Sequence, residues 1–418
     1  MMEKIKTVFK EPICDFCAGR QFAELLSGFT NEERGKTVRR AAAMMIDAGE
    51  KIEADMSNFH GVRFRNLKAG EIKHKPCVIC KDFFSNELDK IAESAVKKLG
   101  DIEFYTFLVG SIPSAETMRA EEKLWSEAGI EFVEPIKSEI NRELGKKIEK
   151  LTGKKFSLAN PDVVILADIA TDRIKLQPKS LYIASGYKKL VRGVPQTKWI
   201  CSDCQGKGCK KCKGVGKMYK TSVQEEVEKH LIKAAKAKRS KFHGAGREDV
   251  DARCLDYRPF VIELVRPERR IIDLRKLVKL INKSRKVKVD KLRFVDKDYV
   301  VKIKTDRLDK TYMAEVTFAK VIDRKKMKFV KKIIGNIAQQ TPNRVLHRRA
   351  DKVRNREVKS LAVKMVGKNK LRVTVKAESG LYIKELMSGD AGRTKTNVAD
   401  VLGNKVKKIS LDVIRIHK

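Results

Sequence analysis

Hydrophobic positions change their spacing several times along the chain, and each change predicts a different element. Residues 103–113 are rich in aromatic and β-branched side chains, which predicts a β-strand. Residues 114–130 and 133–156 place apolar side chains three and four apart, which predicts two amphipathic helices. Strand patterns return in residues 160–193 and end in the basic stretch SGYKKLVRG. These elements predict a small α/β module over residues 86–198.

The second half of the chain carries mainly strand patterns. Ser222 and Glu225 have capping-box spacing and predict the start of a helix, and a second helix is predicted over residues 271–284. Strands are predicted at residues 299–305, 311–318, 360–366, 371–378 and 409–416. Several strands with few helices predict an α+β domain with a mainly antiparallel sheet over residues 221–418.

Charge identifies the kind of partner. The 418 residues include 93 Lys and Arg against 54 Asp and Glu, a formal net charge of +39 that is spread along the chain. A nucleic-acid backbone is the simplest partner for such a surface. An anionic membrane is the rival, yet no apolar run approaches the roughly 18 residues of a membrane span, and residues 1–14 lack the apolar centre of a signal peptide. We expect a cytoplasmic protein of two or three domains.

Eight of the nine cysteines form C-x-x-C pairs, and only Cys254 stands alone. Two such pairs can bind one tetrahedral metal ion. The pairs Cys201/Cys204 and Cys209/Cys212 lie in CSDCQGKGCKKC, a compact stretch that resembles a zinc ribbon or the cysteine-rich repeat of certain co-chaperones. We expect a zinc knuckle over residues 199–220, with free thiols as the alternative.

The other two pairs, Cys14/Cys17 and Cys77/Cys80, lie about sixty residues apart in the chain. Thr30 and Glu33 predict the cap of a helix between them. We therefore expect a second structural zinc in a segment over residues 1–85, with a helical insert. His74 is a possible substitute ligand, although a surface histidine is the simpler interpretation. The cysteines account for all four ligands at each site, which favours structural over catalytic zinc.

Three carboxylates, Glu248, Asp249 and Asp251, lie close together in HGAGREDVDAR. Carboxylates repel the phosphates of a nucleic acid, so their presence in a protein that binds one needs an explanation. They form either a salt-bridged loop or a chemical site, and by themselves they favour the loop.

Three motifs change this balance. GRED at residues 246–249, KTYMAEV at 310–316 and ESGLYIKEL at 378–386 follow one another in the order of the three motifs of pseudouridine synthases. The stretch at residues 138–165, with NPDVVI, resembles a THUMP domain, a module of tRNA-modifying enzymes. With the early C-x-x-C pairs, the chain resembles the archaeal and eukaryotic synthase family that modifies uridines 54 and 55 in the T arm of tRNA. One departure is that only Asp256 and Tyr257 separate RCL from RPF, where a Gly-containing loop is expected.

The resemblance implies roles for three residues. Asp249 is the catalytic carboxylate, with Asp251 as the runner-up, and it acts either by covalent attack or by removing a ribose proton. Lys384 keeps Asp249 ionised. Tyr312 lies against the target base and assists the final proton loss, whereas its alternative role is core packing.

The resemblance also implies an RNA-binding surface. Residues 325–356 resemble the mobile thumb loop of the family, which helps to flip the uridine out of its stack; an ordinary basic loop is the alternative. We expect residues near the cavity, on the thumb and on the accessory module to contact tRNA: Arg247, Tyr382, Arg393, Lys395, Arg344, His347, Arg348, Arg349, Tyr187, Lys188, Lys189 and Arg192.

Two other classes remain as alternatives. A non-catalytic zinc-ribbon RNA-binding protein or RNA chaperone explains the charge and the cysteines, but it leaves the third motif unexplained. A methyl- or thio-transferase with a THUMP module lacks support, because the chain has no Gly-rich strand-to-helix turn suited to a nucleotide cofactor. We expect a monomeric isomerase without an organic cofactor.

Overall fold

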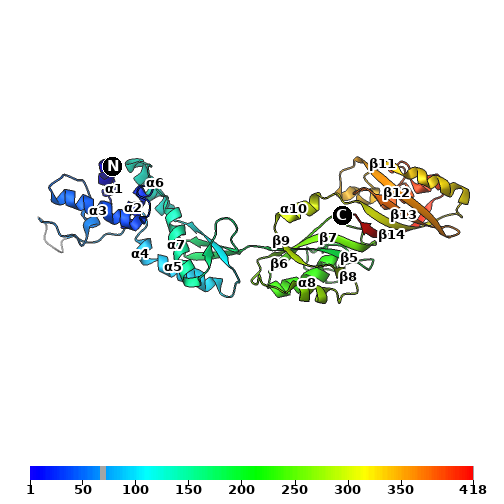
Figure 1. Ribbon diagram of the computed structural model, residues 1–418, viewed down its shortest axis with the longest axis horizontal. Helices are drawn as coiled ribbons and strands as arrows, with labels where there is room; N and C mark the ends of the chain where they lie inside the picture. Colours follow the sequence, from blue (N-terminus) through cyan, green and yellow to red (C-terminus); the bar gives the residue numbers. More distant parts are fainter. Residues whose placement is uncertain (66–71, 418) are drawn as a thin grey trace. The chain divides into compact units, whose positions relative to one another are not determined.

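The computed structural model describes residues 1–65 and 72–417, apart from the side chain of Arg348. It contains two compact units, Met1–Lys179 and Ser180–Lys418 (Figure 1). The predicted boundary at residue 198 is wrong, because strand β5 (Leu181–Lys189) pairs along its length with the second unit's sheet. The knuckle segment 199–220 also belongs to the second unit.

The first unit begins with helices around the first two cysteine pairs. Its main helix, α3, begins after the predicted capping box: Thr30 accepts from the Glu33 amide, and Glu33 accepts from the Thr30 amide. The helices of this part are α1 (Met2–Val8), α2 (Asp15–Gly19), α3 (Asn31–Asp47), α4 (Phe83–Asn86) and α5 (Leu88–Leu99), with 3-10 turns η1 (Arg20–Phe22) and η2 (Met56–Phe59).

The α/β module in the same unit has the predicted alternation of strands and helices. Its sheet has the order β2-β1-β3-β4, in which β1 pairs in parallel with β2 and β3, and β4 is antiparallel to β3. Phe107, Ile140 and Ile165 are buried in the core that the helices and the sheet share. The elements are β1 (Thr106–Ile112), α6 (Ala115–Ala128), α7 (Ile136–Thr152), β2 (Lys155–Phe156), β3 (Val163–Asp168) and β4 (Arg173–Pro178).

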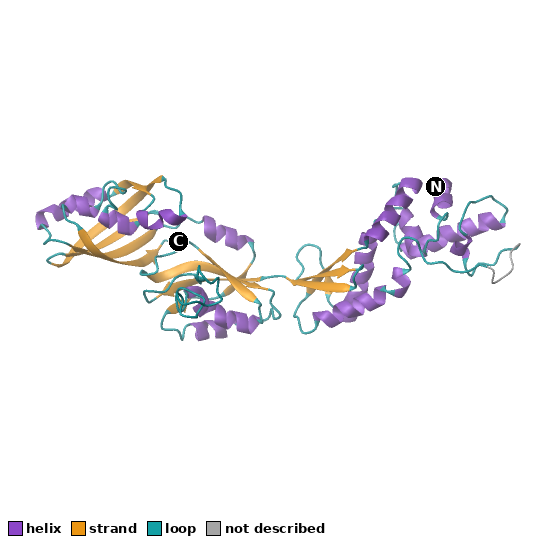
Figure 2. Cartoon of the chain, turned by 180° about the vertical axis from the view of Figure 1, so that it is seen from behind, coloured by secondary structure: helices purple, strands orange, loops and turns teal. Residues whose placement is uncertain are grey.

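The second unit is built on one 10-stranded sheet with the order β11-β12-β13-β10-β14-β7-β5-β8, to which β6 and β9 add at β7 and β5 (Figure 2). Its pairs are antiparallel except for β7 with β14, so the α+β class with a mainly antiparallel sheet is confirmed. The strands after β5 are β6 (Arg239–Gly244), β7 (Arg253–Val265), β8 (Val287–Val289), β9 (Arg293–Val295), β10 (Lys310–Phe318), β11 (Gly335–Gln340), β12 (Val353–Gly367), β13 (Lys370–Ala377) and β14 (Val406–Ile416).

The helices of this unit include both that the pattern predicts. Ser222 caps α8 by accepting from the Glu225 amide. The strand predicted at residues 299–305 is wrong: this stretch forms α10, in which Val300 and Ile303, three residues apart, are buried on one face. The helical elements are α8 (Val223–Ala235), α9 (Leu274–Ile281), α10 (Asp298–Thr305), η3 (Arg324–Ile333), η4 (Asn343–Arg348), α11 (Ile383–Ser388) and α12 (Val398–Leu402).

Two segments differ from the sequence expectation in detail. The basic segment 325–356 is not a simple loop, since it contains β11, which pairs with β12. Asp256 and Tyr257 continue β7, so an extended strand runs where the family pattern has a loop. Every helix in the described part of the chain is too short or too polar to cross a bilayer.

Candidate active site and metal centres

A cavity of about 460 Å³ opens in the second unit where the three motifs meet. The loop between β6 and β7 brings Asp249, the middle strand β10 brings Tyr312, and the first turn of α11 brings Lys384. Leu411 and Val413 of β14 also line the cavity. Side chains that are up to 135 residues apart in sequence, from 249 to 384, thus share one site.

Asp249 is held between two cations. Its Oδ1 accepts from Arg344 Nη1 at 3.0 Å, and its Oδ2 lies 3.4 Å from Lys384 Nζ. Burial by itself would raise the pKa of the Asp249 carboxyl, but the charges of Arg344 and Lys384 outweigh it and lower this pKa below its ordinary value. The carboxylate is therefore ionised at neutral pH.

Lys384 has a second and closer partner. Its ammonium lies 2.7 and 2.8 Å from the two carboxylate oxygens of Asp251. The Asp251 side chain is 62% exposed, whereas that of Asp249 is 29% exposed. The two carboxylates of the motif therefore share one lysine, and the one on the cavity wall is Asp249.

Tyr312 reaches the cavity from β10, on the same face of the strand as the buried Ala314 and Val316, because side chains two residues apart point to the same side. Burial raises the pKa of Tyr312 to about 12, and the nearby charge of Arg258 only partly opposes this rise. The phenol is therefore neutral at physiological pH and retains a proton that it can donate.

Arg344 and its neighbours connect segment 325–356 to the cavity. Arg344 Nε donates to Oε1 of the buried Glu385 at 2.6 Å, so this arginine joins Glu385 to Asp249. Arg349 donates to the Tyr382 hydroxyl at 2.7 Å, and both residues line the cavity. Arg344 of segment 325–356 thus contacts the loop that carries Asp249 and also lines the cavity.

Of the other residues predicted to contact tRNA near the cavity, one lines it and others lie elsewhere on the surface. Arg247 lines the cavity. Arg393 donates to the Thr341 carbonyl at 2.9 Å and pairs with Asp351, which ties it to the segment 325–356. His347 and Lys395 are exposed, and the side chain of Arg348 lies outside the described residues.

Four residues expected on the accessory module lie in the second unit. Tyr187 and Lys189 are fully buried, so they cannot contact RNA directly, and that prediction is wrong for both. Lys188 lies over the Tyr257 ring, 4.4 Å from its centroid. Arg192 is exposed but donates to the Asp251 carbonyl at 2.7 Å and to Asp412 at 2.6 Å. Tyr187 and Lys189 are buried because β5 is an interior strand, paired with β7 on one side and with β8 and β9 on the other.

Sequence reasoning missed Arg258 and Gln196, two buried polar residues on the cavity wall. Arg258 lies 3.0 Å from Glu248, and Gln196 donates to the Gly246 carbonyl at 2.8 Å. Arg258 is the arginine of the RPF tripeptide. Its place among strand-forming residues was the only sign in the sequence of its burial. Glu385 left no comparable signal, since it resembles any helical glutamate.

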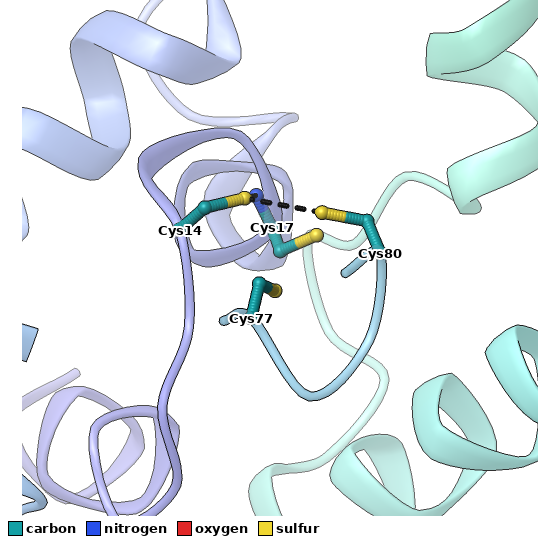
Figure 3. A group of neighbouring side chains, drawn as sticks. All are labelled: Cys14, Cys17, Cys77 and Cys80. Carbon is teal, nitrogen blue, oxygen red and sulfur yellow. Dashed lines mark hydrogen bonds between the residues drawn. The ribbon is translucent and has the colours of Figure 1, made fainter. Parts of the chain in front are cut away.

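The first cysteine cluster brings together four sulfurs from two distant pairs. Cys14, Cys17, Cys77 and Cys80 place their Sγ atoms within 4.8 Å of one another, and Cys14 and Cys80 are 3.4 Å apart (Figure 3). None of these four cysteines forms a disulfide. His74 instead contacts Asp82 at 2.9 Å and is exposed, which fits a surface histidine.

The second cluster fits a tetrahedral ion closely. Zn–S bonds of about 2.3 Å give sulfur separations of roughly 3.8 Å. The Sγ atoms of Cys201 and Cys209 are 3.8 Å apart, and Cys212 lies 3.7 Å from both Cys204 and Cys209. The amides of Gly208 and Gly216 donate to Sγ atoms at 3.1 Å each, which stabilises thiolates. Each cluster could hold one metal ion.

Comparisons with known proteins agree with this arrangement. The family described as "Pus10, C-terminal" matches residues 182–417, and "Pus10 THUMP domain, archaeal" matches residues 91–168. The tRNA pseudouridine synthase Pus10 of Methanothrix thermoacetophila is 42% identical over 414 residues, 97% of this chain and 92% of its own length. That of Methanocaldococcus jannaschii is 40% identical over 426 residues, 98% of this chain and 92% of its own. The chain therefore belongs to the Pus10 family of tRNA pseudouridine synthases.

Proposed function

We propose that this enzyme isomerises uridine 54, uridine 55 or both in the T arm of tRNA. The observation that carries the proposal is the meeting of Asp249, Tyr312 and Lys384 in one cavity, the residues that match the three synthase motifs. The motif resemblance supports the T arm as the target, and the relatives support tRNA as the substrate.

In the proposed reaction Asp249 is the catalytic carboxylate. The uracil leaves the ribose, turns and rejoins it through carbon 5, so the reaction needs no external energy source. Asp249 either attacks covalently or removes a ribose proton. Lys384 and Arg344 keep it ionised, since both lie within 3.4 Å of its oxygens.

Tyr312 assists at the end of the reaction. Its ring supports the base, and its hydroxyl relays the proton lost from carbon 5: the phenolic oxygen accepts that proton while its own proton passes to solvent water. The target uridine is stacked inside folded tRNA, so the enzyme flips it out and offsets the lost stacking with backbone contacts. Segment 325–356 and the basic residues Arg247, Arg393 and Lys395 supply those contacts.

The remaining parts of the proposal concern cofactors and partners. Each cysteine cluster holds a structural Zn²⁺; the supporting evidence is that each has four sulfurs within 4.8 Å of one another, and that those of the second cluster have the separations of a tetrahedral site. Zinc closes and stabilises each cluster and takes no part in the isomerisation. The enzyme acts as a monomer in the cytoplasm.

Release of tritium from tRNA labelled at uridine carbon 5 tests the proposal. The wild-type protein releases tritium, and mapping of the product finds pseudouridine at position 54 or 55. Asp249→Asn loses at least about 10³-fold in rate and still binds tRNA. The matched control is Asp290→Asn, an exposed aspartate that is not among the cavity-lining residues. Full tritium release by Asp249→Asn, or modification elsewhere in the tRNA, contradicts the proposal.

A further inference from the structure

Three charged side chains are buried behind the loop that carries Asp249. Lys189, Glu248 and Arg258 have side-chain exposures of 0%, 1% and 1%. Arg258 Nε lies 3.0 Å from Glu248 Oε2, and Lys189 Nζ lies 3.4 Å from Glu248 Oε1. The Tyr187 hydroxyl also donates to Glu248, at 2.9 Å. We call Lys189, Glu248 and Arg258 the buried triad.

The cationic members of the triad hold the backbone of this loop at its start and at its middle. Arg258 Nη1 donates to the Ala245 carbonyl at 3.1 Å, before Asp249. Lys189 Nζ donates to the carbonyl of Asp249 itself at 2.9 Å. The loop is thus fixed to β5 and β7, two neighbouring strands of the large sheet.

Gln196 closes the same network. Its Nε2 atom donates to the Gly246 carbonyl and to the Tyr187 hydroxyl, both at 2.8 Å. Gly246 has φ of +71°, a left-handed conformation that costs other residues energy. The glycine therefore also favours this turn. Buried side chains therefore hold the carbonyls of Ala245, Gly246 and Asp249.

Stability alone does not explain this network. Removing three charges from water costs several kcal/mol per ion, and apolar residues of the same size are often at least as stable in such places. The triad has two positive and one negative members, so a net positive charge stays buried. What the triad provides instead is a fixed backbone for the loop, at the carbonyls of Ala245 and Asp249.

Adjacent residues in this loop face opposite ways. The Glu248 carboxylate is directed into the protein interior, while the Asp249 carboxylate faces Arg344 and the cavity. A shift of Glu248 therefore moves Asp249. We propose that the buried triad is the positioning device of the active site, with Glu248 as the anchor that fixes Asp249 against the substrate. This inference rests on the proposed catalytic role of Asp249.

Arg258 connects the same device to Tyr312. Arg258 and Tyr312 both line the cavity, and the arginine charge opposes the rise in the Tyr312 pKa that burial causes. One buried cation therefore acts on the loop of the first motif and on the tyrosine of the second. Lys189, Glu248 and Arg258 are positioning residues, since they act through Asp249 and Tyr312.

Single-turnover rates and tRNA dissociation constants test the inference. Glu248→Gln keeps the size of the side chain and removes the charge, and Lys189→Met leaves Glu248 and Arg258 as a neutral pair. Both variants are expected to lose about 10- to 100-fold in rate, because a small misplacement of a reacting group has that effect, with the tRNA dissociation constant unchanged within about twofold.

The matched control is Glu263→Gln. Glu263 is 8% exposed on the same strand β7 as Arg258 and binds Lys241 at 3.1 Å, so this change also removes a largely buried charge from the second unit. Its rate should equal that of the wild type. A purely structural role would make all three variants lose folded protein, with no loss of rate per folded molecule.

Melting temperatures and Asp249→Asn separate the remaining outcomes. If Glu248→Gln fails to fold, Lys189→Met decides, since it leaves no unpaired buried charge. Wild-type turnover in either folded triad variant overturns the positioning role. If Asp249→Asn itself keeps full turnover, the proposed function fails. If it loses turnover while both triad variants keep theirs, only this inference fails.

Discussion

Lys384 binds Asp251 more closely than it binds Asp249. The ammonium is 2.7 Å from the nearer Asp251 oxygen and 3.4 Å from Asp249 Oδ2. Distance alone would therefore select Asp251 as the partner of the basic residue. Exposure favours Asp249 as the catalytic carboxylate, because Asp251 is 62% exposed and Asp249 lies on the cavity wall beside Arg344. We interpret Asp251 as a surface carboxylate that helps to orient Lys384.

The first prediction separates these two carboxylates. Asp251→Asn should lower turnover by less than about fivefold, because an exposed ion pair contributes at most about 1 kcal/mol. Asp249→Asn should lower it by at least about 10³-fold. Initial rates of tritium release from labelled tRNA compare them. The reverse order of effects would identify Asp251 as the catalytic carboxylate.

The second prediction concerns acid pH. Burial raises the pKa of Asp249, but Arg344 and Lys384 outweigh this and lower the pKa below the ordinary aspartate value of about 3.9. The ionised form is therefore lost only as the pH falls through this lowered pKa. In Arg344→Gln the pKa of Asp249 rises, and the acid limb of the single-turnover rate should move to higher pH.

A surface arginine provides the control for this pH profile. Arg372 pairs with Glu315 at 2.7 Å on the neighbouring strands β13 and β10. Arg372→Gln removes the same charge but leaves both partners of Asp249 in place, so its acid limb should coincide with that of the wild type. Coinciding limbs in Arg344→Gln and the wild type would show that Arg344 does not control the Asp249 pKa.

The third prediction concerns the Tyr312 hydroxyl. Tyr312→Phe keeps the ring and removes the hydroxyl that assists the loss of the carbon 5 proton, so turnover should fall by about 10²-fold while tRNA binding is retained. Because burial raises the pKa of Tyr312 to about 12, its ionisation should produce no alkaline limb below that pH. Tyr182→Phe, on β5, is the control. Equal rates in Tyr312→Phe and the wild type would show that the hydroxyl is not needed and that only the ring of Tyr312 contributes.

The fourth prediction concerns metal. Elemental analysis should find two zinc ions per chain, one for each cysteine cluster. Cys77→Ser and Cys209→Ser should each retain one. Structural zinc contributes directly to folding. Cys77→Ser should therefore lower the thermal stability of the first unit, and Cys209→Ser that of the second.

The two variants also control for each other, because their clusters lie in different compact units. Differential scanning calorimetry should show a different transition shifted in each. A wild-type chain that binds no zinc, or a pair of variants that both retain two ions, would contradict the assignment.

The sequence by itself determined the chemistry of this protein. Spacing identified the cysteine pairs, and three short motifs predicted the catalytic residues and the enzyme class; the relatives bear out the class and contradict the non-catalytic alternative. Local signals also determined the caps of α3 and α8, because a cap depends on side chains only three residues apart.

Only the tertiary structure decided where the basic residues lie. The sequence predicts that Tyr187 and Lys189 bind RNA, but β5 is an interior strand between β7 and β8, and both side chains are buried near Glu248. Whether a charge faces solvent or a buried partner depends on strand order, which joins residues 60 positions apart or more and leaves no local pattern. For the same reason residues 299–305 look like a strand, although packing of Val300 and Ile303 makes them a helix.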